Sequence, residues 1–260
     1  MLKLFCLLMI SQLISNFTII KKIDNQAIPS NKSTHIVTSF KIRVLISIVL
    51  TVVLILSGLD LNWGNWLLST GLVFITNSLI DYVLTCQSIK TTFKKWFPKY
   101  KDLFIYLTEQ IARLGSIYVV TCIVSHRSLL TFQVINTLDA TLIPRETVNL
   151  LILTFFLIGT LSAAQIIKLF LSALSLSNVK GTPISNQSIG IIIGVLERSI
   201  IILFVVGEAY SGVATVIALK TLSRFKSIED DKEFAEYYLV GNLLSLAFSV
   251  VTGLLIRFYS

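Results

Sequence analysis

The sequence is poor in charge. Only 14% of its 260 residues are charged, whereas 54% are hydrophobic. A soluble domain carries about a quarter charged residues, so there is too little polar surface here to cover a water-soluble fold of this length. We expect lipid to be the solvent for most of the chain and no sizeable soluble domain.

Residues and motifs for metal or nucleophile chemistry are also scarce. The sequence holds two histidines, His35 and His126, in loops expected on opposite faces of a membrane, which argues against a histidine-based metal site. It contains no HExxH, GxSxG, P-loop or GxGxxG motif. Its three cysteines are widely separated in or beside apolar segments, which is typical of buried free thiols. We expect neither a metal nor a cofactor.

Long apolar runs are what the sequence does contain. A membrane-spanning helix needs about 20 mostly apolar residues. An additional segment, 207–225, is rich in small residues and fits either a span or a re-entrant hairpin. The pattern predicts an all-α integral membrane protein, a bundle of about eight transmembrane helices, with seven plus a re-entrant segment as the alternative. The other runs are 2–20, 44–59, 63–84, 103–124, 150–176, 189–206 and 237–256.

The basic loops predict how the chain crosses the membrane. With eight crossings, the loops rich in lysine and arginine all fall on one face, which the positive-inside rule makes cytoplasmic. Both termini are then outside. We expect a four-helix N-terminal half at 1–126, an external loop at 127–149 and a four-helix C-terminal half at 150–260.

One basic segment is interleaved with aromatic residues. Lysines near an anionic membrane surface contribute about 1 kcal/mol each, and aromatic side chains suit headgroup depth. We expect membrane lipids as partners and no nucleic acid, although topology alone could require the lysines; a homo-oligomer is an open alternative. The lysines expected to meet anionic headgroups are Lys90, Lys94, Lys95, Lys99 and Lys101.

Charged and amide side chains within the apolar runs are the candidate site, because burying them in a bilayer is costly. Glu109 and Arg113 are one helical turn apart and can pair on one face, either to neutralise each other or to line a solute path. Asp81 lies near the end of its run and can also reach headgroup water. The predicted intramembrane polar cluster is Asn16, Asp81, Glu109, Arg113, Glu197 and Arg198.

Two features near Glu197 concern helix packing. Gly190 and Gly194 form a GxxxG pattern, which is predicted to let a neighbouring backbone come close on the face that carries Glu197. Lys220 and Arg224 share a face, where snorkelling to headgroups is the ordinary explanation. Glu208 is expected in the first turn of a helix, where an acid is favourable.

The C-terminal half carries a recognisable set of segments. They are L-E-R at 196–198, K-T-L-S-R-F at 220–225 and E-Y-Y-L-V-G-N-L-L-S at 236–245. This resembles the signature of a family of uncharacterised bacterial multi-pass membrane proteins, classed as a domain of unknown function. The resemblance implies a protein of the bacterial cytoplasmic membrane. Its signature residues here are Lys220, Arg224, Glu236 and Tyr237, whereas Thr221 and Asn242 depart from the usual Ser and Thr.

The N-terminal half resembles the same family less closely. The family patterns H-x-x-x-D-F, H-x-x-x-D-Y and D-Q-x-x-H have amides or an arginine here in place of the histidines. Any metal chemistry that the family's histidines imply is therefore not expected. The corresponding positions are Gln12 and Asn16, Asn77 and Asp81, and Glu109 and Arg113.

Two classes of function fit these observations. The first is a binding, transport or membrane-scaffold role that uses the intramembrane charged residues. The alternative is an intramembrane enzyme acting on a lipid or lipid-linked substrate, with Asp81 and Glu109 as its acid and base. The enzyme requires the two carboxylates to converge on a hydrated pocket. Because nucleophile and metal motifs are missing, we favour the first class and expect that the protein is not an enzyme.

Overall fold

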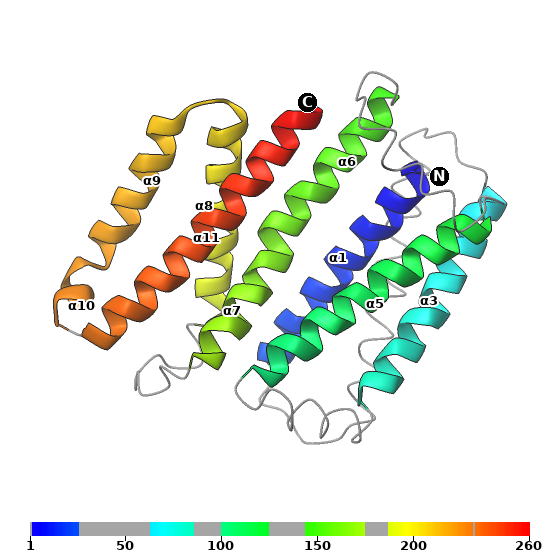
Figure 1. Ribbon diagram of the computed structural model, residues 1–260, viewed down its shortest axis with the longest axis horizontal. Coiled ribbons are helices and arrows are strands. Elements are labelled where there is room, and N and C mark those ends of the chain that lie inside the picture. Colours follow the sequence, from blue (N-terminus) through cyan, green and yellow to red (C-terminus); the bar gives the residue numbers. More distant parts are fainter. Residues whose placement is uncertain (1, 26–62, 86–99, 125–143, 175–186, 231) are drawn as a thin grey trace. The chain divides into compact units, whose positions relative to one another are not determined.

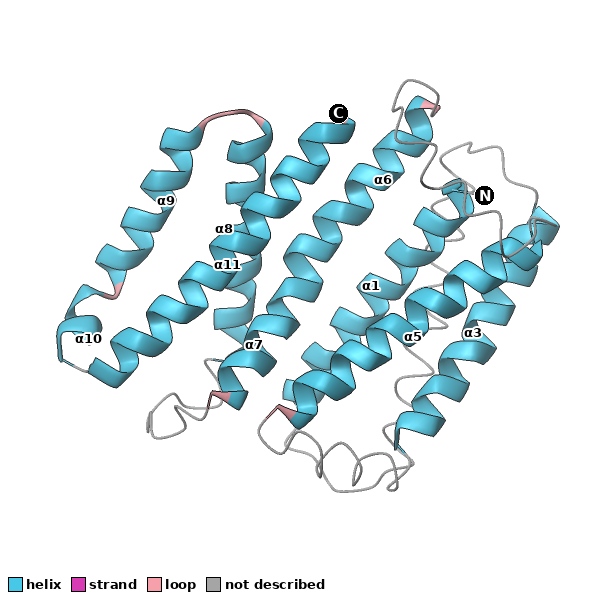
Figure 2. Cartoon of the chain, in the orientation of Figure 1, coloured by secondary structure: helices cyan, strands magenta, loops and turns pink. Residues whose placement is uncertain are grey.

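The structure is a computed structural model of the chain, and it describes residues 2–25, 63–85, 100–124, 144–174, 187–230 and 232–260. Every regular element in these ranges is a helix, as Figure 2 shows, so the predicted all-α class is confirmed for them. The chain separates into two compact units, Met1–Thr154 and Phe155–Ser260. Each unit is described by itself.

The first unit contains α1 (Leu2–Asn25), α3 (Trp63–Thr85), α5 (Lys101–Val124) and most of α6 (Arg145–Leu157) (Figure 1). α3 and α5 form its most extensive helix pair, and α1 also packs on α5. α1 is the most buried of these helices over its first half. Its buried apolar side chains are Leu4, Cys6, Leu7, Leu8, Met9, Ile10 and Leu13.

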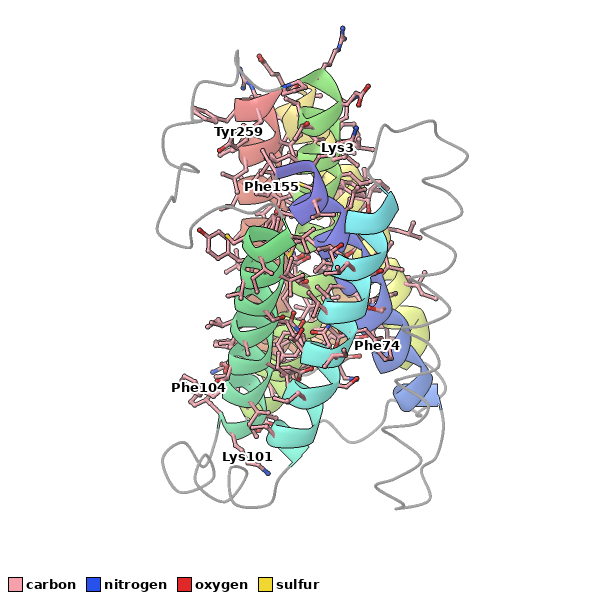
Figure 3. The ribbon with its side chains drawn as sticks, turned by 90° about the vertical axis from the view of Figure 1, so that its right-hand side faces the viewer. Lys3, Phe74, Lys101, Phe104, Phe155 and Tyr259 are labelled. Atoms are coloured by element: carbon pink, nitrogen blue, oxygen red, sulfur yellow. The ribbon has the colours of Figure 1, made fainter. Side chains whose placement is uncertain are left out.

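Lys3 and Lys101 lie at opposite ends of this first unit (Figure 3). The Lys3 ammonium donates to the Glu146 carboxylate at 3.0 Å, which joins the start of α1 to the start of α6. Lys101 begins α5, and its ammonium lies 4.0 Å from the carboxylate of Asp102. Both ion pairs lie at helix ends. The polar groups in the middle of the unit are described with the candidate site below.

The second unit contains the end of α6 and its continuation through a π-helical turn, η3 (Ile158–Ser162), into α7 (Ala163–Ala173). α11 is its central helix, because it packs against α7, α8, α10 and η3. α9 returns beside α8 after a turn at 207–209 (Figure 1). The bounds of the remaining helices are Gln187–Val206 for α8, Tyr210–Ser223 for α9, Phe225–Asp230 for α10 and Lys232–Tyr259 for α11.

Small residues set the spacing of the helices in the second unit. A Cβ on Gly253 of α11 would lie 2.6 Å from the Val205 Cγ1 of α8, and a Cβ on Gly159 of η3 would lie 2.3 Å from the Thr252 Oγ1. Helices in lipid gain little from apolar burial and depend on close van der Waals contact. At the ends of α6 and α11, Phe155 and Tyr259 stack with ring centroids 5.8 Å apart (Figure 3).

α6 begins earlier than the sequence predicted. The apolar run starts at 150, but the helix starts at Arg145, directly after Pro144. The Pro144 carbonyl accepts from the amides of Thr147 and Val148 at 2.8 and 3.1 Å. Proline is well suited to a helix start because its missing N–H needs no partner there, and Glu146 in the first turn complements the helix dipole. Residues 127–143 of the predicted external loop lie outside the described ranges.

Three helices are long and apolar enough to cross a membrane, judged over the described part of the chain: Lys101–Val124, Arg145–Ala173 and Lys232–Tyr259. Many exposed side chains along these helices and α8 are large and apolar; Ile111, Leu203 and Phe258, for example, are 69%, 64% and 63% exposed. Arg113 and Arg198, in contrast, are 2% and 4% exposed. This inside-out distribution suits lipid better than water.

Eight crossings stay a prediction. The run at 44–59 lies outside the described ranges. Within 207–225 the structure has one uninterrupted helix, α9, of 14 residues. At 1.5 Å per residue it is about 21 Å long, which is shorter than the hydrocarbon core of about 30 Å.

Candidate functional site

A hydrogen-bonded polar network crosses the interior of the first unit. Arg113 of α5 forms an ion pair with Glu109 one turn earlier, and its Nη1 donates to the Asn16 Oδ1 of α1 at 2.8 Å. The Gln12 Nε2 donates to the same oxygen at 3.1 Å. The Asn77 Nδ2 of α3 then donates to the Gln12 Oε1 at 2.7 Å. The network therefore joins three helices.

Arginine sets the direction of this network. A guanidinium can only donate hydrogen bonds, so the Asn16 amide must present its oxygen to Arg113. Gln12 must then offer its nitrogen to Asn16, which leaves the Gln12 oxygen to accept from Asn77. The amide orientations, which are otherwise assigned from their surroundings, are thus fixed in sequence from the charged end.

The network contains three of the predicted site residues and two that were not in the predicted cluster. Asn16, Glu109 and Arg113 come together as expected. Gln12 and Asn77, 6% and 3% exposed, were noted only as places where amides replace histidines. Their occurrence inside apolar runs was the signal, because a buried amide needs partners. The side chain of Asp81 lies outside what the structure describes, so its convergence with Glu109 stays a prediction.

A second charged cluster lies in the second unit. Glu197 of α8 forms an ion pair with Lys220 of α9. The Tyr238 hydroxyl of α11 donates to the backbone carbonyl of Lys220 at 2.9 Å. One residue from each of the three C-terminal segments therefore meets here. Snorkelling of Lys220 to headgroups stays a prediction, and the structure adds a partner for its ammonium, the carboxylate of Glu197 on the neighbouring helix.

Arg198, next to Glu197, turns to a different set of partners. Its Nε donates to the Thr160 carbonyl in the π-helical turn at 3.3 Å, and its Nη1 donates to the Ser245 hydroxyl at 3.4 Å. Its buried Nη2 has no hydrogen-bond partner. Among the described side chains, its hydrogen bonds go to uncharged oxygens alone. π-helical turns are frequent at functional sites, so this arginine is a candidate functional residue.

The glycine contacts differ from those predicted. Among the described residues, nothing lies within 4 Å of a Cβ built on Gly190, and a Cβ on Gly194 would meet the guanidinium of Arg198 at 3.4 Å. Gly194 thus makes room for a side chain of its own helix. The close helix approach expected at the GxxxG occurs instead at Gly253 of α11, which meets Val205 about three turns further along α8 than Gly194.

The remaining signature and basic residues lie at the surface of the second unit or outside the description. Arg224 and Glu236 are exposed, and Tyr237 is half-buried. Arg224 is the C-terminal cap of α9, where its amide donates to the Thr221 carbonyl at 3.1 Å. The predicted headgroup lysines 90, 94, 95 and 99 lie outside the described ranges.

The described parts of the two units contain no cluster of side chains that could bind a metal ion. No group of three His, Cys, Asp or Glu side chains lies together there, and Cys6 and Cys122 are buried free thiols. The arrangement keeps charged groups and amides away from lipid. It also links helices through the hydrogen bonds and ion pairs of these groups.

Comparison of the chain with protein-family models, with curated proteins and with solved structures finds no match. The family resemblance of the signature segments therefore stays a prediction.

Proposed function

We propose that this chain is a multi-pass membrane protein with a binding, transport or membrane-scaffold role, in which intramembrane charges join helices. One observation carries the proposal. Each intramembrane carboxylate with a described side chain is already paired with a cation, Glu109 with Arg113 and Glu197 with Lys220. A general acid or base must be available to a substrate proton. The Glu197–Lys220 pair joins α8 to α9, and the Glu109–Arg113 pair of α5 is joined to α1 through Asn16.

The enzyme alternative requires more than the described residues supply. It assigns acid and base roles to Asp81 and Glu109, but Glu109 is bound by the guanidinium of Arg113. A carboxylate held by a guanidinium is less available to a substrate proton. A discriminating observation is the place of the Asp81 carboxylate. Convergence with Glu109 on a pocket open to one leaflet would favour the enzyme.

The proposal includes the family and the location suggested by the signature. Two observations support them. Residues from the three C-terminal segments meet at Glu197, Lys220 and Tyr238. Five positions from the three N-terminal patterns meet in the network of the first unit. The proposed location is a bacterial cytoplasmic membrane, with eight crossings and both termini outside, which single-cysteine accessibility in each loop would test.

An exchange of charges tests the scaffold role of the ion pair. Glu197→Lys alone and Lys220→Glu alone place like charges together, and the double exchange restores a pair across α8 and α9. We expect both single variants to lose most of the monodisperse protein in size-exclusion chromatography after detergent extraction. The double exchange should recover a large part of it. Single variants that extract as well as the unaltered chain would overturn the proposal.

Glu229→Lys provides the matched control for the exchange. This residue lies in α10, where its side chain is exposed. The same change of charge there should leave the monodisperse fraction unaltered. A loss equal to that of Glu197→Lys would mean that net charge, and not the pair, decides assembly.

A further inference from the structure

The long helix of α6 and α7 contains one extra residue at the π-helical turn η3. The Ala163 amide donates there to the Ile158 carbonyl, five residues earlier instead of the four of an α-helix. Each residue of an α-helix turns the chain by about 100°, because about 3.6 residues complete one turn. Loss of the extra residue from η3 would therefore turn α7 by about 100° relative to α6 and leave both segments helical.

The sequence of α7 fits such a second register. When α7 turns by one residue, each place on its buried face passes to the residue one position earlier. The place of Ile167 passes to Ile166, an identical side chain, and each buried alanine gives its place to another alanine or to a serine. Gln165 is the exception, because an alanine takes its place. Both registers therefore bury faces of similar shape. The buried residues of α7 in the observed register are Ala163, Ala164, Gln165, Ile167 and Ala173.

The α6 side of the turn does not have this freedom. If α6 turned instead, the place of the buried Thr154 would pass to Phe155, which is much larger. A Cβ on Gly159 would lie 2.3 Å from the Thr252 Oγ1 of α11, so Thr160 cannot take the place of Gly159 without overpacking. We conclude that α7 is the part of the long helix that can turn.

Arg198 of α8 contacts the turn in the observed register. Its Nε donates to the Thr160 carbonyl inside η3 at 3.3 Å, and its Nη1 donates to the Ser245 hydroxyl of α11 at 3.4 Å. Both distances are longer than the usual value of about 2.9–3.0 Å, and the buried Nη2 has no hydrogen-bond partner among the described residues. The guanidinium thus stabilises the register in which the Thr160 carbonyl faces it, but it binds this carbonyl weakly.

We propose that the helix of α6 and α7 has two registers and that Arg198 stabilises the one with the extra residue in η3. When the arginine releases the Thr160 carbonyl, the extra residue passes along α7 to its end, and α7 turns by about 100°. Closely packed helices change between discrete arrangements of this kind. The two registers do not depend on the role proposed above, because they follow from the sequence and contacts of the second unit.

Double electron–electron resonance on the full chain in lipid nanodiscs tests the two registers. Spin labels on noncanonical residues at the exposed positions Ser172 of α7 and Leu203 of α8 leave the native cysteines in place. A label at Leu243 of α11 gives a second reference for Ser172. A side chain at the rim of a helix about 10–12 Å wide moves by about 8 Å when the helix turns by about 100°.

Release of the turn is tested by Arg198→Met with these labels. We expect one distance for each pair of labels in the unaltered chain and a second distance in Arg198→Met, because methionine cannot donate to the Thr160 carbonyl. If Arg198→Met has the same distance distributions as the unaltered chain, Arg198 does not decide the register and the proposal is overturned.

Deletion of Leu161 provides the reference for the second register, and it is independent of whether Arg198→Met folds. The deletion removes one residue from η3, so that the long helix can be α-helical throughout. We expect the second distance alone in this variant, with or without Arg198→Met. A deletion variant that does not fold or keeps the original distance would overturn the proposal. So would a second distance in Arg198→Met that differs from that of the deletion variant.

Arg257→Met is the matched control. The Arg257 Nη1 donates to the Tyr210 hydroxyl at 3.1 Å, and its ion pair is with Glu208, so its described partners lie outside η3. The same replacement of arginine by methionine should leave the distances as they are in the unaltered chain. A second distance in Arg257→Met would mean that loss of either arginine loosens the second unit, which would contradict the specific role of Arg198.

Discussion

The Nε of Arg198 donates to the backbone carbonyl of Thr160 at 3.3 Å, within the one described turn where the long helix of α6 and α7 widens to a π-helix. The guanidinium is 4% exposed. It is therefore a buried cation held by uncharged oxygens, whereas its neighbour Glu197 pairs with Lys220. A buried charge of this kind costs several kcal/mol, so we expect Arg198 to add no net stability to the fold.

Replacement of Arg198 tests this interpretation. Arg198→Met removes the desolvation cost and keeps a similar length, so the thermal unfolding midpoint should equal or exceed that of the unaltered chain. Arg198→Lys keeps the charge and loses the planar fork of donors, so the midpoint should fall. Thermal unfolding of both variants in the same detergent measures the difference. A methionine variant less stable than the lysine variant would show that the charge of Arg198 stabilises the fold.

Tyr238→Phe should weaken the junction of α9 and α11. The Tyr238 hydroxyl donates to the Lys220 carbonyl at 2.9 Å, and a hydrogen bond of this type contributes about 0.5–1.5 kcal/mol. We expect a loss of free energy of unfolding in that range. Tyr237→Phe, the same deletion one residue earlier on another face of α11, is the control and should cost less. Equal losses would argue against a specific role for the Tyr238 hydroxyl.

Two glycine replacements should have opposite effects. A Cβ on Gly253 would lie 2.6 Å from the Val205 Cγ1, whereas among the described residues nothing lies within 4 Å of a Cβ on Gly190. Gly253→Ala forces α8 and α11 apart, and overpacking of this kind costs about 1–3 kcal/mol. Gly190→Ala should be neutral or stabilising by up to about 1 kcal/mol, because alanine is the better helix former. Chemical unfolding of both variants decides; a destabilised Gly190→Ala would place a partner helix there.

The sequence predicted those features that depend on the spacing of residues along a single helix. Apolar runs located the described helices, the short α10 excepted, to within about five residues. The i,i+4 spacing predicted the pair of Glu109 and Arg113. Contacts between helices could not be predicted in this way. Glu197 and Lys220 are 23 positions apart on different helices, and no periodicity relates the two.

The same limit explains the glycines and the network. The GxxxG at Gly190 and Gly194 was visible because both residues lie on one helix, but the place along α8 at which α11 comes closest depends on tertiary packing. Gln12 and Asn77 were visible as isolated amides in apolar runs, yet their partners lie on other helices. A single sequence identifies polar groups that need a partner without identifying the partner.

The end of α8 gives a last prediction, at Glu208. This residue has φ of 58°, a left-handed conformation that favours glycine. The Ala209 amide donates to the Phe204 carbonyl at 2.8 Å and the Glu208 amide to the Val205 carbonyl at 3.2 Å, which is the Schellman pattern of a helix C-terminus. Glu208 thus ends α8, and the expectation that it lies in the first turn of the next helix is wrong, because α9 starts at Tyr210.

Glu208 also forms an ion pair with Arg257 at 2.5 Å, at side-chain exposures of 60% and 44%, and such exposed pairs contribute about 0–1 kcal/mol. Glu208→Gly and Glu208→Ala both lose that pair, so their difference isolates the backbone. The glycine variant should be more stable than the alanine variant by about 1–2 kcal/mol, the cost of a left-handed conformation for a residue with a Cβ. Glu208→Gln, which keeps the side chain and loses its charge, should change stability by less than about 1 kcal/mol. Unfolding free energies of the three variants test this, and an alanine variant as stable as the glycine variant would show that the turn changes its conformation at no cost.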